Sequence, residues 1–256
     1  MSCYVILGLP RTGTSIVNDL LVEQYKGWNL EEHWRLHEKD FHIRRFLKTD
    51  SQSNDVVIKA TLNYYNEQHK RLSYLINNTT TNWVLKFWVT DCIVHKNITE
   101  RIHSNPNIRM LLTHRQNVLE HFTSIVNARY RRDVLKFNQG MFQYTNKLAI
   151  KQPSYDKITY KPNMLVHMAI EYLELLKNWR LIYDQYKSHA TIISFEDMVT
   201  NMDLSVIGVT KETVDSYTKR DEYLVPTPFN ATKFEHQGTY EDCLDMLSKY
   251  SYMMDI

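Results

Sequence analysis

The chain has 256 residues, of which 43% are hydrophobic and 23% charged, a size and composition typical of a globular protein with a substantial core. Lysine and arginine number 31 against 29 aspartates and glutamates, so the formal net charge is +2 at pH 7. This balance gives no reason to expect a nucleic-acid partner, and it leaves anion binding to local clusters of charge.

Cysteine usage and hydropathy narrow the class of protein further. Cys3, Cys92 and Cys243 are too few and too scattered for a disulfide framework or a zinc cluster, which predicts a reduced, cytoplasmic protein. No stretch reaches about 18 consecutive apolar residues, so we expect no transmembrane helix and no membrane partner. The N-terminus has neither the basic region nor the long apolar core of a signal peptide.

Short apolar runs predict buried strands, and segments with helical periodicity between them predict helices. In chain order we expect a strand at Cys3–Leu7, a helix at Ser15–Gln24, a polar and largely helical stretch at Lys39–Asn82, strands at Trp83–Trp88 and Ile108–Thr113, a helix at Val118–Tyr130, an irregular segment at Lys136–Lys161, a helix at Met164–Tyr186, a strand at Thr191–Phe195 and a helix at Thr239–Tyr250.

This alternation predicts right-handed crossovers and therefore a three-layer α/β fold, a parallel sheet with helices on both faces. We expect one domain over residues 1–256, with the irregular segment 136–161 as a mobile lid. Glu196 and Asp197 favour the first turn of a helix after the last strand.

The connection between the first strand and the first helix is the most informative segment. Gly8 and Gly13 have the Gly-x4-Gly spacing of a Walker A loop, and Ser15 holds its terminal hydroxyl position. Such a loop gathers backbone amides at a helix N-terminus, where the dipole favours an anion. The Walker lysine is replaced by Thr14, and the cation is Arg11 instead. The alternative is that the two glycines only shape a tight turn.

Residues 10–15, Pro-Arg-Thr-Gly-Thr-Ser, resemble the 5′-phosphosulfate loop of sulfotransferases that use 3′-phosphoadenosine 5′-phosphosulfate. The resemblance implies a P-loop NTPase-like sulfotransferase fold, that nucleotide as sulfonate donor, adenosine 3′,5′-bisphosphate as product, and no required metal. It also implies that the 5′-phosphate is bound by Arg11, as a bidentate clamp, together with Thr12, Gly13, Thr14 and Ser15.

A second element follows the strand at Ile108–Thr113. Arg115 comes at the strand end, and Asn117 can serve as N-cap of the next helix. An arginine followed eight or nine residues later by a helix hydroxyl resembles the family's 3′-phosphate element, which implies that Arg115 and Ser124 hold that phosphate, with Thr123 as the alternative hydroxyl. Taken alone, the pattern better fits an arginine that caps a sheet edge and a serine on a solvated helix face. The phosphate interpretation is favoured because the first loop already predicts a nucleotide at the carboxyl ends of these strands.

A further basic candidate lies near the C-terminus. Lys233 falls where the family places a basic loop over the 3′-phosphate, and Gln237 is a second residue of that segment. The family's Arg-Lys-Gly sequence is absent there.

The acid–base candidate lies after the first helix. Glu32 is twenty-one residues beyond Arg11, and Glu32-His33-Trp34 resembles the short glutamate–aromatic element of bacterial trehalose-type sulfotransferases. The resemblance implies that Glu32 takes the acceptor proton, with His33 as the alternative base. Asn29-x-x-Glu32 is also a capping-box pattern, which predicts a helix start instead.

Lys86 is a charged residue inside an otherwise apolar strand, where it needs a polar partner at the strand end. Steroid and phenol sulfotransferases carry Lys-Thr-His in a comparable strand, whereas this chain has Lys86-Phe87-Trp88 and lacks that histidine. The resemblance implies that Lys86 assists the leaving group. The alternative is a lysine whose stem only extends out of the sheet edge.

We therefore predict a sulfotransferase that moves a sulfonate directly onto a hydroxyl of a carbohydrate or small metabolite, with Glu32, Lys86 and Arg11 as its catalytic residues. Two alternatives are a divergent P-loop kinase and a non-catalytic nucleotide-binding regulatory protein. A homodimer is left open.

Overall fold

The computed structural model describes residues 2–26, 28–31, 54–77, 82–94, 96–134, 156–201, 203–219 and 233–254. Its strands are β1 (Cys3–Gly8), β2 (Trp28–Glu31), β3 (Trp83–Trp88), β4 (Ile108–His114), β5 (Lys157–Ile158), β6 (Thr191–Ser194) and β7 (Lys233–Phe234). Its helices are α1 (Thr14–Tyr25), α3 (Asn54–Asn77), α4 (Val89–Val94), α5 (Lys96–Ser104), α6 (Val118–Asp133), α8 (Pro162–Tyr186), α9 (Phe195–Asn201), α10 (Lys211–Thr218) and α11 (Gln237–Ser248), with the 3-10 turns η1 (Ser205–Ile207) and η2 (Ser251–Met254).

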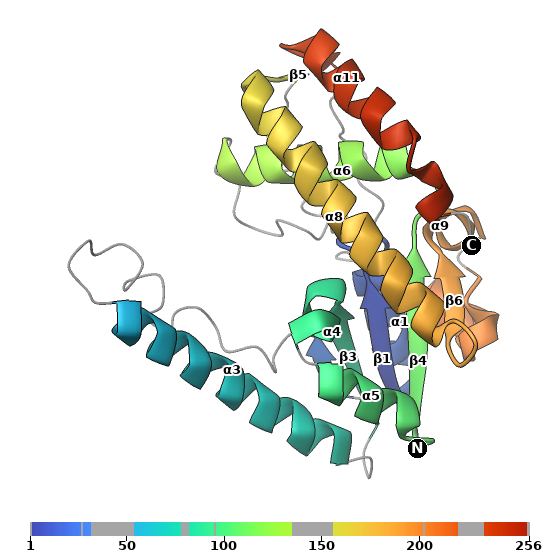
Figure 1. Ribbon diagram of the computed structural model, residues 1–256. Coiled ribbons are helices and arrows are strands. Elements are labelled where there is room, and N and C mark those ends of the chain that lie inside the picture. The colour runs from blue at the N-terminus through green and yellow to red at the C-terminus, as the bar shows by residue number, and fades with distance from the viewer. Residues whose placement is uncertain are drawn as a thin grey trace.

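Five strands form one parallel sheet in the order β2-β3-β1-β4-β6, with β1 at its centre (Figure 1). Cys3 of β1 pairs with Trp83 of β3 on one side and with Ile108 of β4 on the other. Because all five strands run the same way, their carboxyl ends share one edge of the sheet, and the loop after β1 lies in the middle of that edge. β5 and β7 pair in a separate two-stranded sheet.

Side chains alternate along β1 and divide the interior into two cores. Cys3, Val5 and Leu7 belong to a core that includes residues of α3, α4, α5, α6, α8 and α11. Tyr4 and Ile6 belong to a second core, built with α1, α9, η1 and α10. Helices therefore cover both faces of the parallel sheet, which confirms the predicted layering of an α/β fold.

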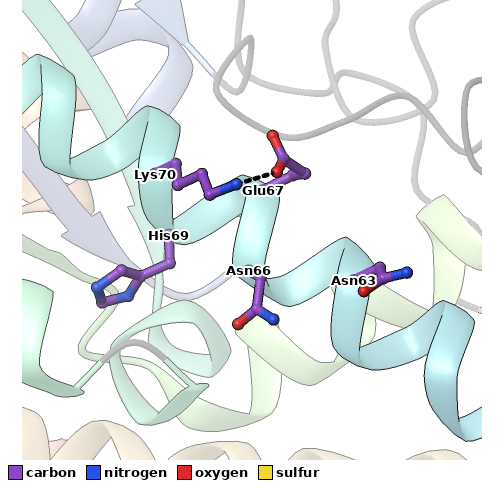
Figure 2. A pocket seen from close by; sticks show the side chains of 5 residues that line it. All are labelled: Asn63, Asn66, Glu67, His69 and Lys70. Carbon is purple, nitrogen blue, oxygen red and sulfur yellow. Dashed lines mark hydrogen bonds and ion pairs between the residues drawn. The ribbon is translucent and has the colours of Figure 1, made fainter.

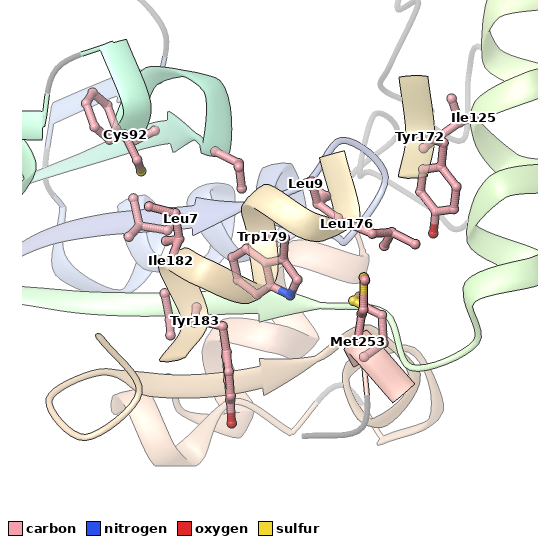
Figure 3. Close-up of a cluster of buried hydrophobic side chains, with 14 of the residues drawn as sticks. Leu7, Leu9, Cys92, Ile125, Tyr172, Leu176, Trp179, Ile182, Tyr183 and Met253 are labelled. Carbon is pink, nitrogen blue, oxygen red and sulfur yellow. The ribbon is translucent and has the colours of Figure 1, made fainter. Parts of the chain in front are cut away.

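The longest helix, α8, supplies much of the larger core. Leu176 and Trp179 are fully buried, and Figure 3 shows them in the cluster that also contains Leu7, Leu9 and Met253. The apolar residues of α8 recur three and four positions apart, so one stripe of the helix faces inward. This stripe supports α6, because Tyr172 of α8 donates a hydrogen bond from its hydroxyl to a backbone carbonyl in the first turn of α6.

Each strand predicted from an apolar run is present, but β1 and β4 each extend one residue further than predicted and β6 ends one residue earlier. Phe195 begins α9 instead of ending β6, and Glu196 and Asp197 lie in the first turn of that helix as expected. Asn117 caps α6 as expected, because its side chain accepts a hydrogen bond from the backbone N–H of Glu120.

The prediction of a capping box at Asn29 is wrong. Residues 28–31 form the edge strand β2, in which Asn29 pairs with Val84 of β3. Strand pairing with a distant segment outweighs the local capping pattern here, since tertiary pairing routinely overrides local preference. In the expected helical stretch 39–82, α3 is a helix over Asn54–Asn77.

Most of the expected lid at residues 136–161 lies outside the described residues. The described remainder, residues 156–161, contains β5 and the short connection to α8. Within the described ranges, none of the helices has the length and apolar character needed to cross a membrane.

The turn after β1 demands glycine at two positions. At Gly8 a Cβ atom would lie 2.2 Å from the Thr113 hydroxyl oxygen of β4 and 2.9 Å from that of Thr12. Gly13 has a φ of +80°, and a Cβ there would lie 2.2 Å from the terminal methyl of Met198. Gly8 is thus required for close approach of the loop to the sheet, and Gly13 for the left-handed backbone that starts α1.

We predict that Gly8→Ala destabilises the protein by about 1–3 kcal/mol, as expected for overpacking, because the added methyl displaces the Thr113 side chain. Urea unfolding followed by circular dichroism measures this difference. The matched control is Gly238→Ala in α11, where a Cβ meets no atom within 4 Å, and alanine should be neutral or slightly stabilising. Equal stability of the two variants would contradict the close-approach argument.

Candidate functional site

The sheet has a topological switch point between β1 and β4. From β1 the chain passes through α1 to β2, on one side of β1, whereas from β4 it passes through α6 and α8 to β6, on the other side. The two cores place α1 and α6 on opposite faces of the sheet. Open α/β sheets bind ligands outside the carboxyl ends of the strands at such a point. The β1–α1 loop, residues 9–13, lies there.

The loop folds back on itself through Thr12. The buried Thr12 hydroxyl donates to the carbonyl of Leu9 over 2.7 Å and lies 3.0 Å from the hydroxyl of Thr113. The Thr12 side chain therefore shapes the loop, and a contact of Thr12 with a ligand would be made by its backbone amide. Arg11 has a φ of +72°, a conformation that most side chains avoid.

The start of α1 provides the backbone donors that the glycine spacing predicts. The carbonyl of Gly13 accepts the first helical hydrogen bond, from Val17, over 3.1 Å. The amides of Thr14 and Ser15 precede that bond and belong to the first turn of α1. They point toward the N-terminal end of α1, the positive end of its dipole.

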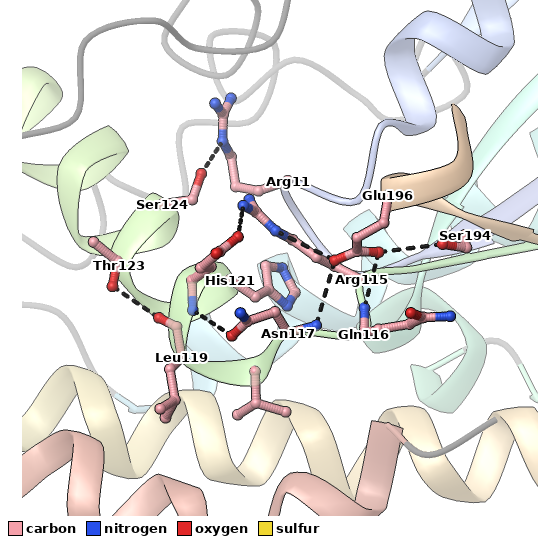
Figure 4. A network of polar contacts seen from close by, with 12 residues as sticks. Arg11, Arg115, Gln116, Asn117, Leu119, His121, Thr123, Ser124, Ser194 and Glu196 are labelled. Carbon is pink, nitrogen blue, oxygen red and sulfur yellow. Dashed lines mark hydrogen bonds and ion pairs between the residues drawn. The ribbon is translucent and has the colours of Figure 1, made fainter. Parts of the chain in front are cut away.

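Two side chains from other elements reach this loop. The Arg11 Nε donates to the Ser124 Oγ of α6 over 3.3 Å (Figure 4), and Ser124 is buried. The Lys86 Nζ of β3 donates to the Ser15 Oγ in the first turn of α1 over 3.1 Å. Lys86 is only 4% exposed, so its ammonium lies inside the structure and not at a solvated sheet edge. The structure thus brings together the predicted residues Arg11, Ser15, Lys86 and Ser124.

Arg115 lies at the end of β4 and contacts two carboxylates. Its Nη2 donates to the Glu120 Oε2 over 3.1 Å, and its Nε is 3.9 Å from the Glu196 Oε1, too far for a hydrogen bond. Its guanidinium also lies over the Phe195 ring, 4.7 Å from the ring centre. Arg115 and Ser124, which the resemblance assigns to one phosphate, have different partners in the structure, because Ser124 accepts a hydrogen bond from Arg11.

Glu196 fixes the turn between β4 and α6. Its carboxylate accepts hydrogen bonds from the backbone N–H groups of Gln116 and Asn117 and from the Ser194 hydroxyl (Figure 4). Burial raises the pKa of Glu196, but these hydrogen bonds together outweigh burial and hold the pKa below its ordinary value of 4.5. Glu196 is therefore ionised at neutral pH and occupies the positive end of the α6 dipole.

Two other candidates from the sequence, Thr123 and Lys233, do not reach this loop. The Thr123 hydroxyl donates to the carbonyl of Leu119 and lies beside the hydroxyl of Tyr240 in α11, so it faces away from the loop. Lys233 is exposed in β7, outside the five-stranded sheet. Glu32 and His33 lie outside the described residues.

Sequence reasoning missed two residues that shape this site. Glu196 was expected only to favour the start of α9, yet it bonds amides 79 and 80 residues earlier in the chain. His121 lies inside the Arg115–Ser124 element, but no pattern in the sequence indicates its partners Pro10 and Tyr172. Both contacts join segments distant in sequence, where only an alignment of related sequences could have given a signal.

A separate hollow of about 500 Å³ lies along the polar side of α3 (Figure 2). It is lined by Asn63, Asn66, Glu67, His69 and Lys70, and the last bonds the Glu67 carboxylate over 2.6 Å. None of these residues belongs to the sheet edge that carries the loop, so we do not include this hollow in the candidate site.

Comparison of the chain with models of known protein families and with curated proteins finds no match. Within the part of the chain that the structure describes, no group of three or more His, Cys, Asp or Glu residues is arranged to hold a metal ion.

We predict that Glu196→Gln removes part of the acid dependence of stability. Because the folded-state pKa is lowered, the carboxylate stabilises the fold above about pH 4.5, and this contribution is lost as the pH falls through the folded value. Urea unfolding between pH 7 and pH 3 should show a smaller decrease in the variant, which starts from lower stability. Asp197→Asn, at the neighbouring position of α9, is the control and should retain the wild-type pH dependence.

Proposed function

We propose that the protein is a sulfotransferase that transfers the sulfonate of 3′-phosphoadenosine 5′-phosphosulfate directly to a hydroxyl of a carbohydrate or small metabolite. One observation carries the proposal: a guanidinium, an ammonium and a helix N-terminus meet at a single loop on the carboxyl edge of the sheet. Arg11 belongs to that loop, and Lys86 bonds Ser15 at the start of α1. Charge-assisted donors placed in this way favour a ligand with closely spaced anionic oxygens.

The phosphosulfate end of the donor fits the β1–α1 loop. In the proposal, Arg11 and the amides of Gly13, Thr14 and Ser15 bind the 5′-phosphate. Lys86 and Val84 lie on the same face of β3, and Val84 packs in the core that contains α1. Lys86 therefore lies on the α1 side of the sheet, where it bonds Ser15. From there its ammonium stabilises the charge that develops on the oxygen between phosphorus and sulfur.

The 3′-phosphate fits between the loop and the start of α6. Ser124 lies against Arg11, and Arg115 is held nearby by Glu120. The Glu120 side chain is 63% exposed, so it can turn into water when a phosphate takes its place. Releasing such an exposed ion pair costs about 0–1 kcal/mol, much less than a phosphate contact contributes.

The chemistry is a direct displacement. The acceptor oxygen forms a bond to sulfur while the bond between sulfur and the bridging oxygen breaks, and the electron pair of that bond remains on the departing 5′-phosphate. Arg11 and Lys86 supply the positive charge, and we propose that no metal is needed. The acceptor proton passes to a base, a role that the likeness to trehalose-type sulfotransferases gives to Glu32.

Calorimetry with adenosine 3′,5′-bisphosphate tests the binding step. We expect wild-type binding that EDTA does not change. Arg11→Ala and Arg115→Ala should each weaken it by about 2–3 kcal/mol, the loss of one charge-assisted hydrogen bond. Arg101→Ala, which removes a surface arginine of α5 bonded to α3, should leave the affinity unchanged.

If the wild type does not bind adenosine 3′,5′-bisphosphate, the proposed function is wrong. Binding and turnover of ATP that require Mg²⁺ would instead support a P-loop kinase.

Transfer of labelled sulfonate to a panel of sugars tests the reaction itself. Lys86→Met should keep nucleotide affinity within about threefold but reduce the transfer rate by about 10²-fold, as for loss of one electrostatic donor. Glu32→Gln should likewise bind the nucleotide and transfer poorly. Normal transfer by Glu32→Gln would exclude Glu32 as the base, and tight nucleotide binding without transfer to any acceptor would favour a regulatory protein.

A further inference from the structure

A buried histidine of α6 joins that helix to the β1–α1 loop. The His121 Nε2 lies 2.6 Å from the carbonyl oxygen of Pro10, and its Nδ1 lies 2.9 Å from the Tyr172 hydroxyl of α8. Both side chains are at most 1% exposed, and their rings meet edge to face with centres 5.3 Å apart. A carbonyl can only accept, so the Nε2 carries a hydrogen and donates it to Pro10.

The imidazole is uncharged. Burial lowers the pKa of His121 to about 3, with the charges of Arg115 and Arg11 acting in the same direction and the bond to Pro10 opposing them. In the neutral ring with a hydrogen on Nε2, the Nδ1 is an acceptor, and the single Tyr172 hydroxyl hydrogen is shared between this Nδ1, at 2.9 Å, and the carbonyl oxygen of Val118, at 3.2 Å.

We infer that His121 and Tyr172 are positioning residues, an uncharged clamp that fixes the carbonyl of Pro10 and thereby holds Arg11 in its anion-binding conformation. The identity of the ligand rests on the proposed function, whereas the clamp itself does not.

The clamp acts on the peptide bond that precedes Arg11. The Pro10 carbonyl and the Arg11 N–H belong to one planar unit, so fixing that plane restricts rotation about the Arg11 φ angle. Arg11 has a φ of +72°, which is unfavourable for a residue with a side chain and persists only where surrounding contacts impose it.

The same helix holds the Arg11 side chain. Ser124 lies three residues after His121, so the two project from one face of α6 on successive turns. His121 fixes the backbone before Arg11, and Ser124 accepts from its guanidinium. Tyr172 lies behind this pair and carries the constraint into the larger core.

Amide hydrogen exchange of Arg11, Thr12 and Gly13, measured in the protein without nucleotide, tests the clamp. His121→Phe should speed exchange of these amides by about tenfold, the effect of losing one buried hydrogen bond. His121→Gln should restore most of the protection, because its amide places a donor near the position of Nε2. Tyr172→Phe should speed exchange by about threefold, since only the hydroxyl is lost.

Tyr130→Phe is the matched control. It removes a buried hydroxyl from α6 that bonds the Thr159 hydroxyl over 2.8 Å, and it should lower overall stability without changing exchange in the loop. Equal loop exchange in Tyr172→Phe and Tyr130→Phe, or no recovery in His121→Gln, would overturn the clamp.

Nucleotide affinity is measured on the same variants. If the wild type binds adenosine 3′,5′-bisphosphate, His121→Phe should weaken that binding by about tenfold, and His121→Gln should recover it. If the wild type binds no nucleotide, the proposed function fails, and the exchange measurements alone still decide the clamp.

Discussion

The left-handed backbone of Arg11 is the constraint on which the candidate site depends. A residue with a side chain pays about 1–2 kcal/mol to adopt this conformation, so the surroundings must supply compensating contacts. Two such contacts are present. The Thr12 hydroxyl donates a hydrogen bond to the carbonyl of Leu9 across the turn, and Ser124 of α6 accepts a hydrogen bond from the Arg11 guanidinium. The resulting turn brings the Arg11 side chain to Ser124 of α6. The site therefore extends from the centre of the sheet toward β4, the side where the strand connections reverse.

The cations of the site have different partners, and this gives its two ends different roles. Lys86 and Arg11 each donate to a serine hydroxyl, whereas Arg115 contacts the carboxylates of Glu120 and Glu196. An anion reaching Arg115 must displace Glu120, which is exposed, but not Glu196, which is held by two backbone amides. Glu196 thus keeps the β4–α6 turn in place whether or not Glu120 has moved. Binding at this end is an exchange of one anion for another, and it is weaker than the charge of Arg115 alone would suggest.

Much of the fold could be predicted from local sequence, because its strands are continuous apolar runs and its helices have a clear stripe. β2 could not, since residues 28–31 become a strand only through pairing with β3. The candidate site likewise has parts that local sequence predicts and contacts that it does not. The glycine spacing indicates a loop at a helix start, and the run from Arg115 to Ser124 indicates a second element that contributes residues to the site. It does not say that Ser124 bonds Arg11, because that pairing depends on how α6 packs across the sheet. The contact of Glu196 with the α6 amides likewise depends on the position of β6 beside β4.

The position of α6 therefore sets the geometry of the part of the site that contains Arg11 and Arg115. The first turn of α6 lies next to Arg115 and ends with His121, and Ser124 follows one turn later. The contacts of His121 and Ser124 with the β1–α1 loop are not local, so their accuracy depends on the packing that holds α6 against the sheet and α8. Phe122 and Val126 are fully buried in that packing, and Phe122 lies against the Tyr172 ring. Interiors of this density resist small displacements, because a shift of one side chain opens a void or a clash elsewhere. The larger core thus does more than stabilise the fold: through α6 it transmits its rigidity to the loop that carries Arg11.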